Sequence, residues 1–394
     1  MSGVVVVGGG LAGATVVTTL REEGFTGPVT LVGAEQHVPY ERPPLSKGYL
    51  QGKDPREDAF VHPREWYAEH DVELRTGTRV AALDREAAEV VLDDGARLPY
   101  EHAVLATGSQ PRRLDVPGAD LAGVRYLRDL DDADGLRAAF GERPRVVVVG
   151  GGWIGLETAA AARAAGLDVT VLERGAVPLE RVLGPAMGQV FADAHVRNGV
   201  HLRTRTEVSE LVGEDGAVRG VRLAGGETVP GELVIVGVGA VPDLRLAAAA
   251  GLEVRDGVVV DAHLRTADPR VLAVGDIAEA WHPRYDRHVR VEHWAAAGRH
   301  GAVAARTILG QDAVDDRLPY FYTDQYDLGM EYVGLADADD EVVVRGGPDA
   351  FIAFWVRDGR VSAGMNVNVW DVSERIEALI TRGGAVDDES WPIP

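Results

Sequence analysis

Cysteine is absent from this chain of 394 residues, and lysine is nearly absent. Without cysteine the chain cannot form disulfides, thiolate metal sites or iron–sulfur clusters of its own, and we expect no metal site. The same absence excludes redox chemistry that ends on a protein disulfide or sulfenate. No apolar run approaches the roughly 20 residues that a membrane-spanning helix needs, so we expect no membrane partner.

Acidic residues outnumber basic ones, and the formal net charge is −22 at pH 7. Phosphate backbones are bound by basic surfaces, so this charge argues against nucleic acid as a partner. The length and the apolar fraction of 46% predict a globular protein of two or three domains. No basic segment precedes the first apolar run at residue 3, which favours a cytoplasmic protein.

Two glycine-rich motifs of the same form stand out. Gly8-Gly9-Gly10-Leu11-Ala12-Gly13 follows an apolar strand over 4–7 and opens a helix over 11–23, after which a strand is predicted over 29–32. Gly150-Gly151-Gly152-Trp153-Ile154-Gly155 follows 145–149 in the same way, with a helix through residue 165 and a strand over 169–172. Each motif is typical of a loop that binds a dinucleotide pyrophosphate at a helix N-terminus. Two such loops indicate two dinucleotides and electron transfer between them.

Acidic residues near the second strand of each unit are candidates for binding a ribose. Glu173 directly follows the strand over 169–172, where a carboxylate accepts from a ribose 2′-hydroxyl and repels a 2′-phosphate. We therefore expect NADH to be preferred over NADPH, although Arg174 beside it is of a type that accommodates a 2′-phosphate. In the first unit the acid is Glu35, two residues past Gly33 and displaced from the usual place.

The segments 102–108 and 233–239 share a second pattern, a buried strand that ends at glycine. Each segment lies at the end of a stretch of chain that begins with a glycine-rich motif. We therefore interpret the chain as an internal repeat, with one nucleotide-binding domain inserted into another. The fold class is α/β, with a first nucleotide-binding domain over 1–110 and 240–318 and a second, inserted nucleotide-binding domain over 111–239. A C-terminal α+β domain over 319–394 ends with a helix near 371–382. Segments 88–92, 227–229 and 258–260 are predicted as hairpin or meander strands.

The two lysines, Lys47 and Lys53, provide an independent indication. A chain with so strong a bias toward arginine keeps lysine chiefly where a compact ammonium is needed, for example at the edge of a flavin ring. The alternative is that both are ordinary surface lysines.

Several motifs together resemble a known family. The run Pro39-Tyr40-Glu41-Arg42-Pro43-Pro44-Leu45-Ser46-Lys47 is the most specific, and the others are Ala106-Thr107-Gly108, Val274-Gly275-Asp276, Glu292-His293-Trp294 and Asp324-Gln325-Tyr326. With both glycine motifs, the chain resembles over its whole length the FAD-dependent ferredoxin reductases of bacterial oxygenase systems, of the putidaredoxin, rubredoxin and biphenyl-dioxygenase reductase types. The resemblance implies a glutathione-reductase-like fold with FAD and NADH as cofactors, in which the FAD-binding domain covers 1–110 and 240–318 and the NAD-binding domain covers 111–239.

The resemblance also implies roles for individual residues. The residues expected to bind FAD are Gly8, Gly10, Leu11, Ala12, Gly13, Glu35, Arg42, Lys47, Ala106, Thr107, Gly108, Asp276, His293 and Trp294. The residues expected to bind NADH are Gly150, Gly152, Ile154, Gly155, Glu157, Glu173 and Gly239. Trp294 would lie against the isoalloxazine, unless it is a core aromatic residue instead. Lys47 is expected to pair with Glu157 beside flavin N5 as the catalytic pair; the alternative is that Glu157 faces solvent.

The absence of cysteine then points to an external one-electron acceptor. The leading hypothesis is an NADH:ferredoxin reductase that supplies a small [2Fe–2S] carrier, or a rubredoxin-like one, for a Rieske oxygenase or a cytochrome P450. The alternatives are an NADH oxidase or diaphorase without a protein partner and a flavoprotein that senses NADH, as in relatives of the apoptosis-inducing factor. An acidic carrier would need a locally basic docking face; the candidates, unless they are dispersed surface charges, are Arg42, Arg112, Arg113, Arg284, Arg287 and Arg290. The C-terminal domain is where a homodimer would form.

Overall fold

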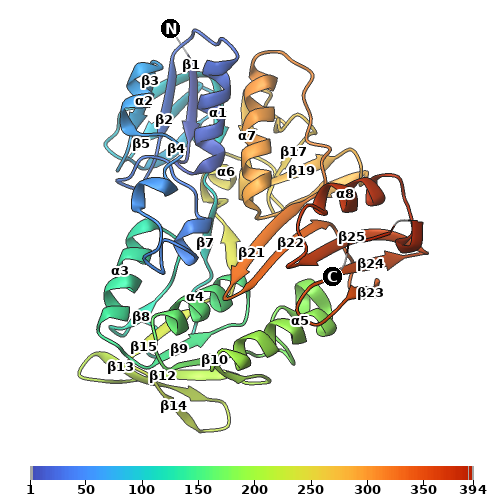
Figure 1. Cartoon of the computed structure of the whole chain (residues 1–394). Helices are drawn as coiled ribbons and strands as arrows, with labels where there is room; N and C mark the ends of the chain where they lie inside the picture. Colours follow the sequence, from blue (N-terminus) through green and yellow to red (C-terminus); the bar gives the residue numbers. More distant parts are fainter. Residues whose placement is uncertain (1–2, 389, 393–394) are drawn as a thin grey trace. The chain divides into compact units, whose positions relative to one another are not determined.

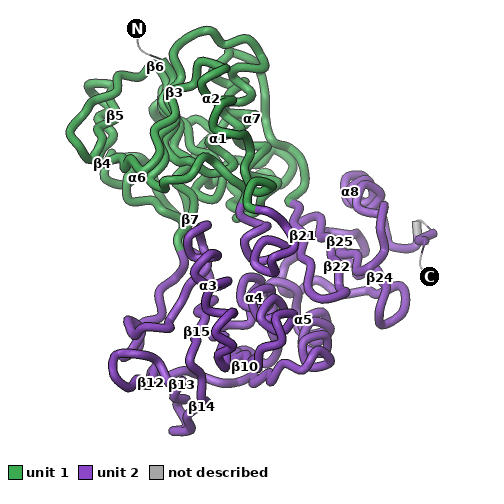
Figure 2. The backbone as a smooth tube through the Cα atoms, turned by 60° about the vertical axis from the view of Figure 1, so that its left-hand side comes forward, with its two compact units in different colours: residues 1–41, 56–110, 241–319 green, residues 42–55, 111–240, 320–394 purple. Residues whose placement is uncertain are grey.

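The structure, a computed structural model, describes residues 3–388 and 390–392. Contacts divide the chain into two compact units (Figure 2), the first of residues 1–41, 56–110 and 241–319 and the second of residues 42–55, 111–240 and 320–394. The chain passes between them through the short strands β7 (Ser109–Pro111) and β16 (Ala240–Pro242), among other places. No helix among the described residues has both the length and the apolar character needed to cross a membrane.

The first unit is built on a mixed sheet of seven strands (Figure 1), whose parallel part has the order β3-β2-β1-β6-β18. Its strands are β1 (Gly3–Val7), β2 (Val29–Val32), β3 (Val72–Arg75), β4 (Val80–Asp84), β5 (Glu89–Leu92), β6 (Arg97–Leu105) and β18 (Val271–Ala273). A smaller sheet holds β17 (Val258–Val260), β19 (Ala278–His282) and β20 (Arg287–Val289). The helices are α1 (Leu11–Glu22), α2 (Arg64–Glu69), α6 (Arg245–Ala249) and α7 (Trp294–Ile308), with 3-10 turns η2 (Arg56–Ala59) and η3 (Gly275–Ile277).

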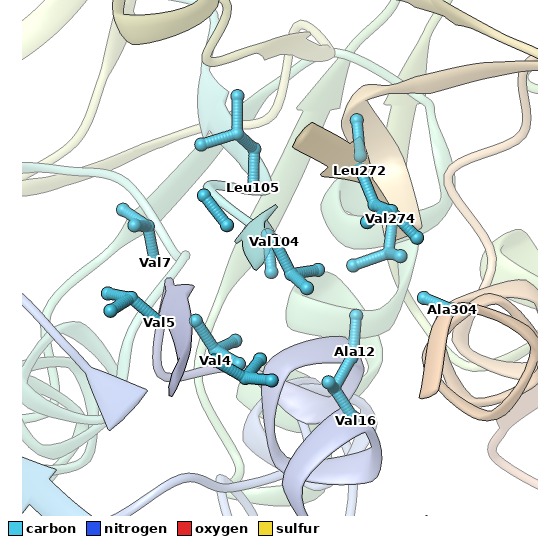
Figure 3. Packing of buried hydrophobic residues seen from close by; sticks show 14 of the residues in the cluster. Val4, Val5, Val7, Ala12, Val16, Val104, Leu105, Leu272, Val274 and Ala304 are labelled. Atoms are coloured by element: carbon cyan, nitrogen blue, oxygen red, sulfur yellow. The ribbon is translucent and has the colours of Figure 1, made fainter. Parts of the chain in front are cut away.

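Valine-rich strands form the core of this unit. Parallel strands covered on both faces are apolar at nearly every position, and all five residues of β1 are buried. Figure 3 shows Val4 of β1 and Val104 of β6 packed with Val16 of α1, while Ala304 of α7 lies close by. The core thereby fixes the carboxyl ends of β1 and β6 next to each other. Between them the strand order reverses, and α/β sheets bind ligands at such a point.

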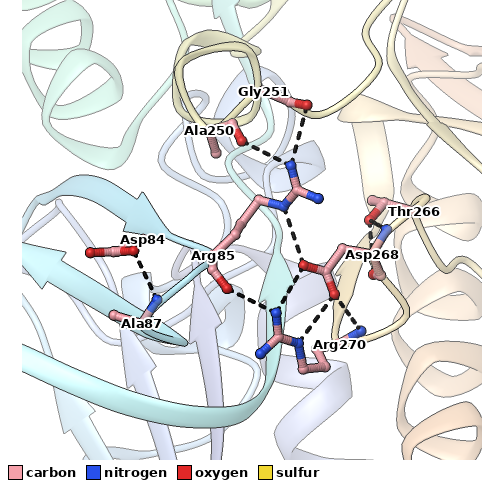
Figure 4. Close-up of polar contacts among 8 residues, drawn as sticks. All are labelled: Asp84, Arg85, Ala87, Ala250, Gly251, Thr266, Asp268 and Arg270. Carbon is pink, nitrogen blue, oxygen red and sulfur yellow. Dashed lines mark hydrogen bonds and ion pairs between the residues drawn. The ribbon is translucent and has the colours of Figure 1, made fainter.

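A buried carboxylate joins parts of the first unit that are far apart in sequence. Asp268 accepts hydrogen bonds from Arg85 Nε at 3.2 Å and Arg270 Nε at 3.3 Å, and Arg85 Nη1 also donates to the carbonyl oxygens of Ala250 and Gly251 (Figure 4). Burial alone would raise the pKa of Asp268, but the bonds from the two arginines lower it below its ordinary value. These hydrogen bonds thus connect Ala250, Gly251 and Asp268 to the turn between β4 and β5.

The second unit repeats the plan with a five-stranded parallel sheet in the order β11-β10-β9-β15-β8. The strands are β8 (Val124–Arg125), β9 (Val146–Val149), β10 (Val169–Leu172), β11 (His201–Arg203) and β15 (Leu233–Val236). The helices are α3 (Leu130–Gly141), α4 (Trp153–Ala164) and α5 (Glu180–Arg197), and the 3-10 turn η1 covers Pro43–Ser46. An antiparallel meander of β12 (Val208–Glu214), β13 (Ala217–Leu223) and β14 (Thr228–Pro230) packs its apolar residues with those of this sheet.

The C-terminal part of this unit is an antiparallel sheet in the order β21-β22-β25-β24-β23. Its strands are β21 (Tyr320–Gln325), β22 (Leu328–Gly334), β23 (Glu341–Gly346), β24 (Phe351–Arg357) and β25 (Arg360–Val367). Helix α8 (Ser373–Thr381) packs on β22 and β25, and a 3-10 turn η4 (Val386–Asp388) follows. The α+β character expected for this part and its final helix are therefore present.

Both expected strand–glycine–helix–strand units are present, and the α/β fold class is confirmed. The hairpin expected at 258–260 is wrong: apart from a single bridge to Val254, β17 pairs in parallel with β19. The reason is that the intervening chain first supplies β18 to the large sheet, a long-range choice that local sequence does not encode. Residues 42–55 group with the second unit, as do both 111–240 and 320–394; the division into three functional domains remains a prediction.

Candidate functional site

The loop between β1 and α1, in the first unit, leaves the N-terminus of the helix open. Gly8 has a φ of 126°, and a Cβ atom there would overlap the carbonyl oxygen of Ala106. Gly10 is the N-cap and supplies no capping side chain, and a Cβ on it would meet no atom within 4 Å. Gly13 lies against the carbonyl of Gly8, which lets the turn begun by Leu11 pack closely. The N–H groups of this turn and the helix dipole suit an anionic pyrophosphate, so the loop fits the first predicted dinucleotide.

Glu35 lies three residues beyond the end of β2, and Tyr40 holds it there. The Tyr40 hydroxyl donates a hydrogen bond to the Glu35 carboxylate, and the Tyr40 backbone forms a bridge with Gly10. The displaced acid is thus tied to the glycine loop. A half-buried carboxylate in this place is suited to accept from a ribose hydroxyl.

Thr107 and Gly108 follow the end of β6, at the other side of the point where strand order reverses. The Thr107 hydroxyl donates to the Asp243 carbonyl oxygen at 2.7 Å, and the Asp243 N–H donates to the Gly108 carbonyl at 2.8 Å. Gly108 has a φ of 65°. These bonds hold the turn after Ala106 in a fixed conformation, next to the Gly8 loop that it contacts.

Asp276 and Trp294 lie in the first turns of two helical segments of the first unit. Asp276 lies in η3. The preceding Gly275 has a φ of 70°, and a Cβ on it would lie only 3.2 Å from the Cβ of Ala12, so this turn packs closely against α1. Trp294 begins α7 and is 41% exposed, so it is not a core aromatic residue. Burial raises the pKa of Glu41, and the hydrogen bond from the Trp294 side chain partly offsets that rise.

His293, the N-cap of α7, carries no side-chain cap bond to its helix. Burial lowers its pKa to about 4, with a partly opposing contribution from Asp276. His293 is therefore neutral near pH 7 and contributes no charge to the site.

The second glycine loop, in the second unit, repeats the geometry of the first. Gly150 has a φ of 104°, and a Cβ on it would overlap the carbonyl oxygen of Gly237. Gly152 is the uncapped N-cap of α4, Gly155 lies against the Gly150 carbonyl, and Ile154 between them is 42% exposed. This loop therefore also fits a pyrophosphate.

Glu173 lies beside this second loop. Its Oε2 accepts from the Gly151 N–H at 2.7 Å, and its Oε1 accepts from the Gly175 N–H. The carboxylate is thus fixed at the end of β10, where a ribose would be bound. Arg174 next to it is exposed and forms no ion pair with any residue that the structure describes. Gly239, with a φ of 109°, follows β15 and accepts from the Arg112 N–H at 2.9 Å.

Lys47 and Glu157 form a largely buried ion pair within the second unit. Lys47 Nζ lies 2.7 Å from Glu157 Oε1, and their side chains are 14% and 4% exposed. Pro43 and Pro44 begin the 3-10 turn that ends at Ser46, and Lys47 caps it. Glu157 is in the second turn of α4, so the alternative in which it faces solvent is wrong.

Two hydroxyls that the sequence analysis did not single out complete the Glu157 environment. Ser46 donates to Oε2, and Thr323 of β21 donates to Oε1 at 2.6 Å. Three donors around one carboxylate satisfy the polar atoms that burial would otherwise leave unpaired. The Lys47 ammonium also lies 5.3 Å from the centroid of the Tyr322 ring. Ser46 stands within a motif already noted, but no spacing in the sequence brings Thr323 to Glu157.

The arginines considered for docking are not equivalent. Arg290 is used internally in ion pairs with Asp256 and Glu292, and Arg42 donates to the carbonyl oxygen of Arg128. The remaining candidates are exposed: Arg112 and Arg113 in the second unit, and Arg284 and Arg287 in the first. Each of these two pairs remains a candidate for docking contacts within its own unit.

Two family models together match most of the chain. The model described as pyridine nucleotide-disulphide oxidoreductase matches residues 2–301, and the model described as reductase C-terminal matches residues 320–391.

Relatives with known names are similar over nearly the full length. The putidaredoxin reductase of Pseudomonas putida is 39% identical in a comparison that covers 99% of this chain and 95% of that protein. The ferredoxin–NAD(+) reductase component of the anthranilate 1,2-dioxygenase system of Burkholderia cepacia is 39% identical over 393 residues, with coverage of 99% and 97%. A crystal structure of the covalent putidaredoxin reductase–putidaredoxin complex matches with a TM-score of 0.94, 38% identity and coverage of 97% and 93%.

Proposed function

Because the chain belongs to the pyridine nucleotide-disulphide oxidoreductase family, we propose that it is an NADH-dependent, FAD-containing ferredoxin reductase serving a Rieske oxygenase or a cytochrome P450. The observation that carries this proposal is full-length similarity to such reductases in a chain without a single cysteine. A family member that reduces a disulfide through its own thiols needs cysteine, so that chemistry is closed to this chain. Transfer to an external carrier is consistent with both facts.

FAD and NADH are the cofactors that the family implies, and the two glycine loops fit them. When bound, FAD takes a hydride from NADH and passes electrons singly to an acceptor. The residues proposed to hold the FAD pyrophosphate are those of the Gly8–Gly13 loop, with Glu35 on the ribose. The Gly150–Gly155 loop and Glu173 are proposed to hold NADH.

The Lys47–Glu157 pair is proposed as the catalytic element that the chain itself supplies. Lys47 would place a positive charge by the flavin, which stabilises the negative charge that arrives with the hydride. Glu157 would keep the Lys47 ammonium in one position, because hydrogen bonds from Ser46 and Thr323 fix the orientation of the Glu157 carboxylate. The pair thus acts by preorganised charge and involves no covalent step.

The proposed partner is a small [2Fe–2S] ferredoxin. Support comes from the matching crystal structure, in which a similar reductase is joined to putidaredoxin. Exposed arginines such as Arg112 and Arg284 are suited to meet an acidic carrier against the negative net charge of the chain. We further propose that the protein acts in the cytoplasm.

Anaerobic rapid mixing of the FAD-loaded protein with NADH and with NADPH tests this function. We expect fast loss of flavin absorbance with NADH and a slower loss with NADPH, because Glu173 repels a 2′-phosphate. The Glu157→Gln variant should be reduced more slowly than the wild type under the same conditions. Slow reduction by both nucleotides would contradict the reductase assignment, and equal rates would contradict the role of Glu173.

A further inference from the structure

A row of buried polar side chains leads away from Glu157 within the second unit. Thr323 and Gln325 point to the same side of β21, because side chains two residues apart share a face of a strand. Gln325 Nε2 lies 3.2 Å from Thr323 Oγ1, and Gln325 Oε1 lies 2.8 Å from Nε2 of His195 on α5. The Tyr326 hydroxyl lies 3.1 Å from His195 Nδ1. Thr323 and Gln325 are each 1% exposed and His195 is 0% exposed.

The direction of every hydrogen bond in this row follows from its end at Glu157. A carboxylate only accepts, so the Thr323 hydroxyl donates to it and its oxygen accepts from the Gln325 amide N–H. The Gln325 oxygen is then left to accept from the His195 Nε2–H. Burial lowers the pKa of His195 to about 4, so its neutral ring has one acceptor nitrogen, Nδ1, for the Tyr326 hydroxyl.

All four bonds therefore run the same way, from Tyr326 toward the carboxylate. Hydrogen bonds arranged head to tail polarise one another, by roughly 10–30% for each bond. Such a row is suited to hold negative charge on Glu157 although its side chain is almost fully buried. It is not suited to conduct protons, because the Gln325 amide would have to lose and regain one.

We infer that Gln325, His195 and Tyr326 are positioning residues for Glu157. They act through the Thr323 hydroxyl, which holds the Glu157 carboxylate in place. The carboxylate in turn holds the Lys47 ammonium. Strand β21 of the C-terminal sheet and helix α5 thus take part in orienting the proposed catalytic pair. The inference rests on the proposed function, because only there does the orientation of Lys47 matter to flavin reduction.

The tautomer of His195 provides a test that does not depend on activity. In protein labelled with ¹⁵N in histidine, the His195 signals are assigned by their loss in His195→Phe. We expect a neutral ring protonated on Nε2 at pH 7, with a tautomer ratio that changes in Gln325→Met. The matched control is Tyr320→Phe. Tyr320 is on β21, as Gln325 is, but its hydroxyl is hydrogen-bonded to Glu331 of β22, so the His195 signals should stay unchanged. A ring protonated on Nδ1 would reverse the row and overturn the inference.

Rapid mixing with a series of NADH concentrations separates positioning from binding. We expect Gln325→Met to lower the limiting rate of flavin reduction about tenfold and Tyr326→Phe about twofold, with the Kd for NADH nearly unchanged. Tyr320→Phe should keep the wild-type rate. Thr323→Val should lose rate like Gln325→Met, and Thr323→Ser, which keeps the hydroxyl, should restore it.

The rate of flavin reduction in the wild type and in Gln325→Met distinguishes failure of the proposed function from failure of the positioning role. A wild-type protein that NADH does not reduce would overturn the proposed function, and this inference with it. A wild type that is reduced rapidly, together with a Gln325→Met variant of equal limiting rate, would overturn the inference alone. A Gln325→Met variant that differs only in its Kd for NADH would also overturn it.

Discussion

Replacing Lys47 by methionine removes the ammonium and keeps most of the side-chain volume. Removing one partner of a fully buried ion pair costs about 3–5 kcal/mol, because the other charge is left without its counter-charge. Here Lys47 is 14% exposed and two hydroxyls still donate to Glu157, so we expect a loss of about 2 kcal/mol in the free energy of unfolding. Removal of one preorganised electrostatic group typically slows catalysis by about 10²-fold or more, and we expect that loss in flavin reduction by NADH.

The chain offers a matched control in its other lysine. Lys53 is exposed, and Lys53→Met removes the same charge and changes the net charge equally. We expect its unfolding free energy to change by less than about 0.5 kcal/mol and its flavin reduction rate to stay at the wild-type value. Both variants are measured by denaturant unfolding and by anaerobic rapid mixing. Flavin reduction at the wild-type rate in Lys47→Met, or an equal loss of rate in both variants, would contradict the role proposed for Lys47.

Three further outcomes follow from the same contacts. Glu173→Gln should raise the preference for NADPH relative to NADH about tenfold, because it removes the charge that repels a 2′-phosphate; kcat/KM for both nucleotides measures this, and an unchanged ratio would contradict it. Gly8→Ala should lower FAD content and cost more than about 2 kcal/mol of stability, because of its φ of 126° and a clash at Ala106, whereas Gly135→Ala in α3 meets no atom within 4 Å and should fold and bind FAD normally. Burial lowers the pKa of His195 and His300 to about 4. The unfolded chain takes up these protons below about pH 6.5 and the native state only near pH 4, so the unfolding free energy should fall between these values by up to roughly 3 kcal/mol for each histidine. Denaturant unfolding at a series of pH values measures this, and an unfolding free energy that stayed constant from about pH 6.5 to about pH 4 would contradict it.

Local pattern predicted most of what lies at the two glycine loops. The helix expected over 11–23 is α1 (Leu11–Glu22), and the strand expected over 169–172 is β10. Both are set by short-range features: a valine run, a glycine turn and an alanine-rich helix. The scarcity of lysine pointed to Lys47, and the family resemblance implied its pairing with Glu157; the structure shows that the two side chains are 2.7 Å apart and almost buried.

Long-range contacts account for what the sequence did not reveal. Thr323, 166 residues from Glu157, reaches its carboxylate only because β21 packs with α4. Residues 42–55 group with the second unit although they follow β2 of the first, and β17 takes a parallel partner from beyond β18. Glu35 was expected to be displaced, but only the structure shows that Tyr40 holds it to the loop. These features depend on tertiary packing, which no local propensity determines.

The proposed function depends above all on whether electrons leave this protein through an iron–sulfur carrier. Cytochrome c reduction is followed with the FAD-loaded protein and NADH, with and without a purified [2Fe–2S] ferredoxin, while oxygen consumption is recorded in parallel. We expect rapid cytochrome c reduction only when ferredoxin is present, and slow consumption of oxygen throughout. Equal turnover of NADH with oxygen alone would contradict it and would indicate an oxidase.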